Sequence, residues 1–203
     1  PDLDTLVVPV GGGGMIAGCA IAARALRPDL RVVGVETESY SAMRQLLAGE
    51  PVTAGGDTLA EGIAVRDIGA LPLAVARALV AEVLTVDEVA IERAIALFLE
   101  VEKTVAEGAG AAGLAALLSH PGTFAGRKVG LVLCGGNIDT RLLASVLLRG
   151  LVRDGRIVRL RLMINDLPGQ LARVAGLVGQ AGGNIVEVQH QRLFGSVVAK
   201  RTE

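Results

Sequence analysis

The chain has 203 residues, of which 51% are hydrophobic and only 2% aromatic, and its formal net charge is -1. The near-neutral charge argues against a nucleic-acid partner, which would need a basic face, and the scarcity of aromatic rings argues against a platform that stacks single-stranded bases. A core of Ala, Val, Leu and Ile around Gly suits helices packed closely on a buried sheet. We therefore expect an α/β fold: a parallel twisted sheet with helices on both faces.

The cysteines indicate the cellular compartment of the protein, and the two termini indicate whether the chain is complete. Cys19 and Cys134 lie far apart, without metal-ligand spacing, and are typical of reduced thiols in a cytoplasmic protein. Residues 5–23 are uncharged, but Pro9 and the glycines that follow it break the helix that a membrane span requires. We expect no membrane partner. Because the chain begins at Pro1 rather than Met and ends in an apparent strand, we expect both ends to be truncated.

The chain opens with a strand, a glycine run, a helix and a second strand, a pattern that predicts a right-handed parallel crossover. In order, we expect a strand over 5–10, a helix over 15–26, a strand over 31–36, a helix over 41–48 and an irregular stretch over 54–69.

Strands and helices continue to alternate after this unit. We expect a strand over 79–86, a helix capped by Asp87 that reaches about Lys103, a helix over 107–119, a strand over 128–133 and a helix over 142–148. A polar segment with a turn at Asp154 and Gly155 predicts the boundary between one domain over 1–150 and a second over 156–203.

The second domain is expected to be a small βαβ unit, too short to bury a core alone. Its predicted elements are a strand over 157–164, a helix over 170–180 and a strand over 184–193. The turn between the first two ends in Pro168 and Gly169, and Pro168 can occupy the first helical position.

The glycines from Gly11 to Gly14 stand between a buried strand and a helix. Without Cβ atoms the backbone can approach a phosphate closely, and the free N–H groups of the first helical turn attract an anion. A β-branched residue at Gly13 is therefore expected to block the phosphate. A tight turn without a ligand is one alternative. Another is a dinucleotide site, because Gly12, Gly14 and Ala17 fit its fingerprint and Glu36 ends the next strand.

A second glycine motif, with Cys134 followed by Gly135 and Gly136, comes after another buried strand. Ligand crevices in parallel sheets form outside the carboxyl ends of strands, so both motifs can face one pocket. The alternative is that Cys134 is a small buried hydrophobic residue.

Four motifs occur together in chain order: VVPVGGGGMIAG at 7–18, LAEGIAV at 59–65, AEGAGAAGLAAL at 106–117 and LVLCGGNID at 131–139. In order and spacing they resemble threonine dehydratases and serine racemases, which are pyridoxal-phosphate enzymes of fold type II. The likeness covers about residues 5–150. The remainder, with IVRLRLMINDLPGQLARV and GGNIVEVQHQR, is similar to an ACT regulatory domain.

The resemblance implies pyridoxal phosphate as the cofactor and gives roles to particular residues. The phosphate would be held by Gly11, Gly12, Gly13, Gly14 and the backbone N–H of Met15. Cys134 would face the pyridine nitrogen, where a neutral partner leaves that nitrogen unprotonated and suits elimination. Gly62 and Glu107 would line the ring, although Glu107 can also be read as an acid that serves a helix dipole.

The chain departs from the family at two places. The lysine that forms the Schiff base with the cofactor belongs to a segment upstream of Pro1, and Lys103, Lys128 and Lys200 fit only surface positions. We therefore expect no catalytic residue in this chain, which would be inactive alone. Some relatives bind a cation near the position of Glu36 with an acid six residues later, but Ala42 stands there, so no metal is expected.

The reaction implied by the resemblance converts threonine to 2-oxobutanoate and ammonia, or serine to pyruvate, and we expect a homo-oligomer. An amino-acid effector would bind the second domain at Asp166, Gly169 and Asn184. Two other functions stay open at this point: a nicotinamide-dependent oxidoreductase, from the dinucleotide fingerprint, and a non-enzymatic amino-acid sensor, from residues 157–203.

Overall fold

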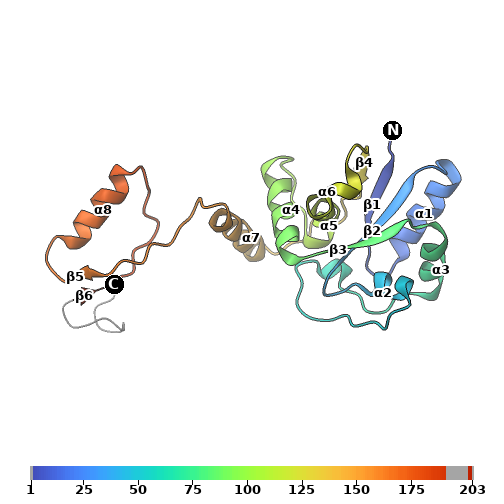
Figure 1. Cartoon of the computed structure of the whole chain (residues 1–203), viewed down its shortest axis with the longest axis horizontal. Coiled ribbons are helices and arrows are strands. Elements are labelled where there is room, and N and C mark those ends of the chain that lie inside the picture. The colour runs from blue at the N-terminus through green and yellow to red at the C-terminus, as the bar shows by residue number, and fades with distance from the viewer. Residues whose placement is uncertain (1, 191–200, 203) are drawn as a thin grey trace. The chain divides into compact units, whose positions relative to one another are not determined.

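The computed structural model describes residues 2–190 and 201–202. The chain divides between Arg156 and Ile157 into two compact units, which are described separately below. Figure 1 draws the elements of both units along the chain. No helix among the described residues is long and apolar enough to cross a membrane.

The first unit is built on a four-stranded sheet in the order β3-β2-β1-β4. Its strands are β1 (Thr5–Pro9), β2 (Arg31–Thr37), β3 (Glu82–Val86) and β4 (Val129–Leu131). Every pairing is parallel, with Val7 opposite Val33 in β2 and opposite Leu131 in β4. The expected parallel α/β sheet is confirmed.

Helices cover both faces of this sheet (Figure 1). One face carries α1 (Gly14–Leu26), α2 (Ala42–Ala48) and α3 (Ala70–Leu79). The other carries the larger group: α4 (Glu88–Glu100), α5 (Gly108–Ser119), α7 (Thr140–Arg153), and the short helices η1 (Glu61–Ile63) and α6 (Pro121–Phe124).

Side chains alternate along the central strands and so feed two separate cores. Val7 and Val33 are fully buried in the cluster that contains α4 and α5, whereas Val8 and Val32 join the cluster that contains α1 and Met43. Each fully buried aliphatic side chain of this kind contributes about 1.5–3 kcal/mol to folding. Both cores therefore fix the sheet from which the loops of the site emerge.

Several predicted boundaries in the first unit are wrong. No helix was expected where α3 lies, and the strand expected from residue 79 begins only at Glu82, as β3. The helix predicted over 142–148 runs as α7 from Thr140 to Arg153, through the polar segment expected to be a linker. The reason is an ion-pair cluster in which Arg149 and Arg153 both contact Glu92 of α4.

The second unit differs more from its prediction. The helix over 170–180 is confirmed as α8 (Gln170–Gln180), but its N-cap is Gly169, so Pro168 precedes the helix instead of opening it. The strand expected over 157–164 is wrong: the only strand there is β5 (Ile164–Asn165), paired antiparallel with β6 (Arg201–Thr202).

The other strand expected in this unit is wrong as well, since residues 184–190 form none; residues 191–193 of that prediction lie outside the described residues. An alternating pattern makes a strand only where a neighbouring strand can accept its backbone hydrogen bonds.

Candidate functional site

The candidate site lies beyond the carboxyl ends of β1 and β4. The chain passes from β1 to β2 on one side, and β4 returns to pair on the other side of β1. Such a reversal of strand order leaves a crevice for ligands. A cavity of about 250 Å³ lies there, and it is lined by Pro9, Gly11, Gly12, Gly13, Gly14, Met15, Gly62, Ile63, Glu107, Ala109, Cys134 and Gly135.

Every residue assigned to the cofactor from the sequence lines this one cavity, although the residues come from four separate segments of the chain. Pro9, Ile63, Ala109 and Gly135 also line it and were not named as site residues. All four lie within the quoted motifs, so the motifs themselves were the available signal.

The glycine loop leaves its backbone donors open. Gly13 is the N-cap of α1 with φ 87°, and no side chain caps this helix. The first helical hydrogen bond runs from the N–H of Ala17 to the carbonyl of Gly13 at 3.1 Å. A Cβ built on Gly12 or Gly14 would meet nothing within 4 Å. An anion can therefore approach the loop from that open side.

Gly13 itself faces the protein interior. A Cβ on Gly13 would lie 2.8 Å from Met43 Cε and 2.8 Å from Pro72 Cβ. A side chain at Gly13 was expected to block the approach of the phosphate, but the structure gives it a different effect. Such a side chain would collide with α2 and α3 behind the loop, and its left-handed φ would be strained.

The start of α5 brings the other loops to the cavity. A Cβ on Gly108 would collide with the carbonyl oxygen of Leu59, and one on Gly110 with that of Cys134. The N–H of Glu107 also donates to the carbonyl of Gly135 at 3.3 Å. The glycines of this helix are therefore needed so that two backbone loops can lie directly against it.

The loop that carries Gly62 contacts α5 and is also held by Glu88, the first residue of α4. Glu88 Oε2 accepts a hydrogen bond from the N–H of Leu59 at 2.8 Å, and a Cβ on Gly62 would lie 3.1 Å from Ala109 Cβ. Sequence reasoning missed Glu88, because an acid at the start of a helix is ordinarily explained by the helix dipole.

Cys134 is half-buried beside Glu107. Burial, followed by the nearby Glu107 carboxylate, raises the pKa of the Cys134 thiol above its usual value. The thiol is therefore neutral at neutral pH. Glu107 is the N-cap of α5, yet its side chain makes no capping hydrogen bond. It lines the cavity in addition to standing at a helix start.

The described lysines lie elsewhere. Lys103 is exposed, and its Nζ donates to the carbonyl of Glu100 at 2.7 Å. Lys128 forms an ion pair with Asp2. Neither lines the cavity, and Lys200 lies outside the described residues.

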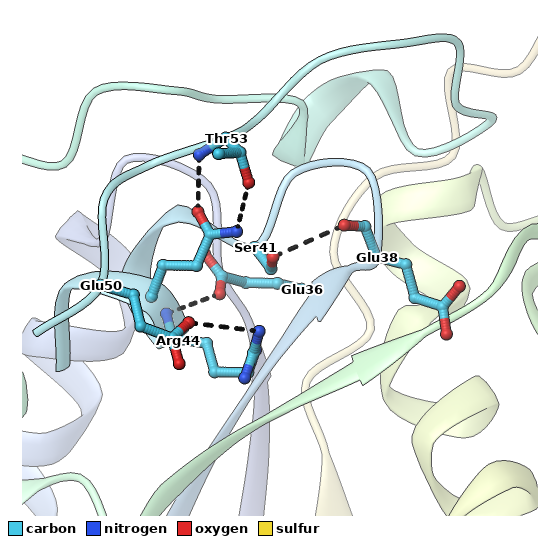
Figure 2. Close-up of polar contacts among 7 residues, drawn as sticks. Glu36, Glu38, Ser41, Arg44, Glu50 and Thr53 are labelled. Carbon is cyan, nitrogen blue, oxygen red and sulfur yellow. Dashed lines mark hydrogen bonds and ion pairs between the residues drawn. The ribbon is translucent and has the colours of Figure 1, made fainter. Parts of the chain in front are cut away.

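Glu36 does not face the cavity. It is 1% exposed near the end of β2, and its two carboxylate oxygens accept hydrogen bonds from the N–H groups of Met43 and Arg44. Figure 2 shows the bond with Arg44. Burial raises the pKa of Glu36 to about 7, against the opposite effects of those two bonds and of the Arg44 charge. A carboxylate engaged in this way is not free to bind a ribose. Among the described residues, no cluster of three His, Cys, Asp or Glu side chains could hold a metal.

The predicted effector residues surround α8. Asp166 and Gly169 precede this helix and Asn184 follows it, and all three are exposed. Gly169 has φ 82° at the N-cap, and no side chain caps α8. The described part of the second unit has no buried residue.

Comparison with known proteins shows the family. Residues 1–135 match the family model described as pyridoxal-phosphate dependent enzyme. The chain is 43% identical to an L-threonine ammonia-lyase of Geobacter sulfurreducens, over 100% of this chain and 51% of that protein. It is 41% identical to an L-threonine ammonia-lyase of Thermotoga maritima, over 95% of this chain and 48% of that protein. The chain thus spans about half the length of these curated relatives.

Solved structures agree. A threonine deaminase from T.th. aligns with a TM-score of 0.63 at 37% identity, covering 68% of this chain and 51% of that one. Maize serine racemase aligns with a TM-score of 0.65 at 34% identity, covering 74% and 48% respectively. The nicotinamide alternative is overturned by these matches. The chain belongs to the family of pyridoxal-phosphate-dependent enzymes.

Proposed function

We propose that the whole protein to which this chain belongs is a threonine dehydratase that also accepts serine. The observation that carries the proposal is the single cavity at the crevice of the sheet, where the motif residues of four chain segments meet. Two relatives that are 43% and 41% identical to this chain are L-threonine ammonia-lyases, which supports threonine as the substrate.

Different residues of this chain would bind different parts of the cofactor. The open N–H groups of Gly12, Gly14 and Met15 suit its phosphate, and Gly62 with Glu107 suits the edge of its ring. The neutral Cys134 thiol suits the pyridine nitrogen, because it does not force a proton onto that atom. When bound, the cofactor supplies an electron sink for the carbanion at the substrate Cα.

The proposed reaction is an elimination followed by hydrolysis. L-Threonine loses the Cα proton and the β-hydroxyl as water, and the resulting enamine takes up water to release ammonia and 2-oxobutanoate. Serine gives pyruvate and ammonia by the same path. The lysine that the family resemblance implies would act as the base that removes the Cα proton. Neither Lys103 nor Lys128 lines the cavity.

Gly12→Ala tests the proposal, with Gly18→Ala as a matched control. Both glycines have open space where a Cβ would stand, but only Gly12 lines the cavity. In the whole protein, Gly12→Ala is expected to weaken pyridoxal phosphate binding by about tenfold or more. Gly18→Ala should bind the cofactor as wild type does. Wild-type protein that forms neither 2-oxobutanoate from threonine nor pyruvate from serine would overturn the proposal.

We further propose that residues 157–203 sense an amino-acid effector in a cytoplasmic homo-oligomer. The support is the uncapped start of α8 at Gly169, whose N–H groups are open to a carboxylate. Isoleucine and valine are the first candidates to assay, with Asp166→Ala and Gly169→Val as variants that should lose the response. If no amino acid changes the activity or the substrate affinity, this unit is structural.

A further inference from the structure

We propose that Glu36 is a positioning residue for the cofactor phosphate. Its carboxylate fixes the first turn of α2, and α2 in turn holds the side chain of Met43 directly behind Gly13 of the glycine loop. The inference rests on the proposed function, because it assigns the support behind the loop that would bind the phosphate.

The first step is the anchoring of α2 by Glu36. The N–H of Met43 donates to Glu36 Oε1 at 2.7 Å and the N–H of Arg44 donates to Oε2 at 2.9 Å. Ser41, at the N-cap position, makes no capping hydrogen bond, and its hydroxyl instead donates to the carbonyl of Glu38 at 3.5 Å (Figure 2). The strand residue Glu36 therefore provides the cap that the helix lacks in its own sequence.

This anchor matters because α2 has 7 residues. A helix of that length does not persist alone in water, so its place depends on outside contacts. Its last turn is held by Gln45, which accepts from the N–H of Thr53 at 2.9 Å and donates to Thr53 Oγ1 at 3.0 Å. Glu36 holds the first turn, and the first turn carries Met43.

The second step is the contact of Met43 with the loop. Met43 is fully buried, in the cluster that also contains Ile16 of α1. Its Cε lies 2.8 Å from the position that a Cβ on Gly13 would take, which is too close for both atoms to fit. Pro72 Cβ of α3 lies 2.8 Å from the same position. Gly13 is the N-cap of α1, so a shift of Met43 would displace the open N–H groups of that helix.

The test compares Glu36→Gln, Met43→Ala and their combination in the whole protein without its cofactor. The ligand is pyridoxine phosphate, which has an alcohol in place of the aldehyde and so reports on non-covalent binding, with pyridoxine as the partner that lacks the phosphate. At a pH above 8, each single variant is expected to bind pyridoxine phosphate about tenfold more weakly, the factor that corresponds to one lost hydrogen bond. Binding of pyridoxine should not change.

Additional readouts separate positioning from general damage. Both substitutions act through one contact, so the double variant should bind no more weakly than the weaker single variant. The phosphorus NMR signal of bound pyridoxine phosphate should shift in each single variant. Met43→Leu, unlike Met43→Ala, should bind the ligand as the wild type does. Glu92→Gln is the matched control, because Glu92 is also a buried carboxylate, at 6% exposure, but pairs with Arg149 and Arg153 away from the loop. It should leave both affinities unchanged.

The outcomes are distinct. Wild-type affinity in both Glu36→Gln and Met43→Ala overturns the inference while the proposed function stands. The inference is also overturned if the losses of affinity multiply in the double variant, or if Glu92→Gln loses as much affinity as Glu36→Gln does. If Glu36→Gln does not fold, Met43→Ala with its Met43→Leu rescue decides alone. Wild-type protein that binds pyridoxine and pyridoxine phosphate equally overturns the phosphate loop itself, and the inference with it.

Discussion

One helix in each unit, α1 in the first and α8 in the second, begins at a glycine, but the surroundings of the two glycines differ. Gly13 starts α1 with φ 87° and Gly169 starts α8 with φ 82°, and neither helix has a side-chain cap. Around Gly13, α2 and α3 approach closely, whereas a Cβ on Gly169 would meet nothing within 4 Å. The same local signal therefore opens a helix in both places. In the first unit the surroundings of Gly13 make it part of a cavity.

Burial should produce the largest difference between the units. Ile91 of α4 is fully buried, whereas Leu177 of α8 is 57% exposed. Ile91→Ala is expected to lower the free energy of unfolding by about 2–5 kcal/mol, because it leaves a cavity in a packed core. Leu177→Ala should change it by less than about 0.5 kcal/mol. Denaturant unfolding of both variants measures the contrast, and equal losses would show that α8 is packed as tightly as α4.

The pH dependence of stability should reveal Glu36. Its pKa is about 7 in the folded protein against a usual 4.5, so the folded state holds a proton that the unfolded state has released. The free energy of unfolding contributed by this group is therefore highest below pH 4.5 and falls as the pH rises to about 7. The span is roughly 3 kcal/mol.

Glu36→Gln cannot titrate and isolates this effect. The difference between the wild-type and variant unfolding free energies should change across that window and be constant above it. Denaturant unfolding at several pH values provides the measurement. A constant difference over the whole range would mean that Glu36 has an ordinary pKa despite its burial.

The Glu92 cluster should give a smaller effect. Glu92 is buried, but its partners Arg149 and Arg153 are partly exposed to solvent. Glu92→Ala is expected to cost about 2 kcal/mol, less than a fully buried pair, because solvent screens the arginines. Hydrogen exchange should show the loss in the last turns of α7. Unchanged protection there would show that the ion pairs do not hold this helix.

Sequence reasoning succeeded where the chain supplies its own partners. The buried strands, the glycine loop and the placing of both glycine motifs at one edge follow from local patterns that agree with the parallel sheet. The cavity then gathers the motif residues because β1 and β4 are neighbours. The roles of these residues came from the family likeness, since no pattern by itself distinguishes a pyridine partner at Cys134 from a small buried thiol.

The failures share a physical cause, which is dependence on contacts distant in the sequence. The polar residues Arg149 and Arg153 extend a helix because Glu92 lies opposite them, 57 and 61 positions earlier in the chain. Met43 matters because it lies behind Gly13, and Glu36 because it caps a helix that follows it. In the second unit, alternation over 157–164 did not yield a strand of that length because pairing is confined to Ile164 and Asn165.

The smallest expected effect is that of Gly169→Ala, which separates backbone strain from packing. At Gly169 only the left-handed φ opposes a side chain, so the substitution should cost about 1 kcal/mol, confined to α8. Gly13→Ala carries the same strain and adds collisions with Met43 and Pro72, so its cost should be clearly greater. Hydrogen exchange of the first turn of α1 in Gly13→Ala, and of the first turn of α8 in Gly169→Ala, measures the two costs. If the two substitutions cost the same, Met43 and Pro72 can move aside, and their contacts do not hold the glycine loop in place. If Gly169→Ala costs more, α8 is held by contacts beyond those that its described residues make.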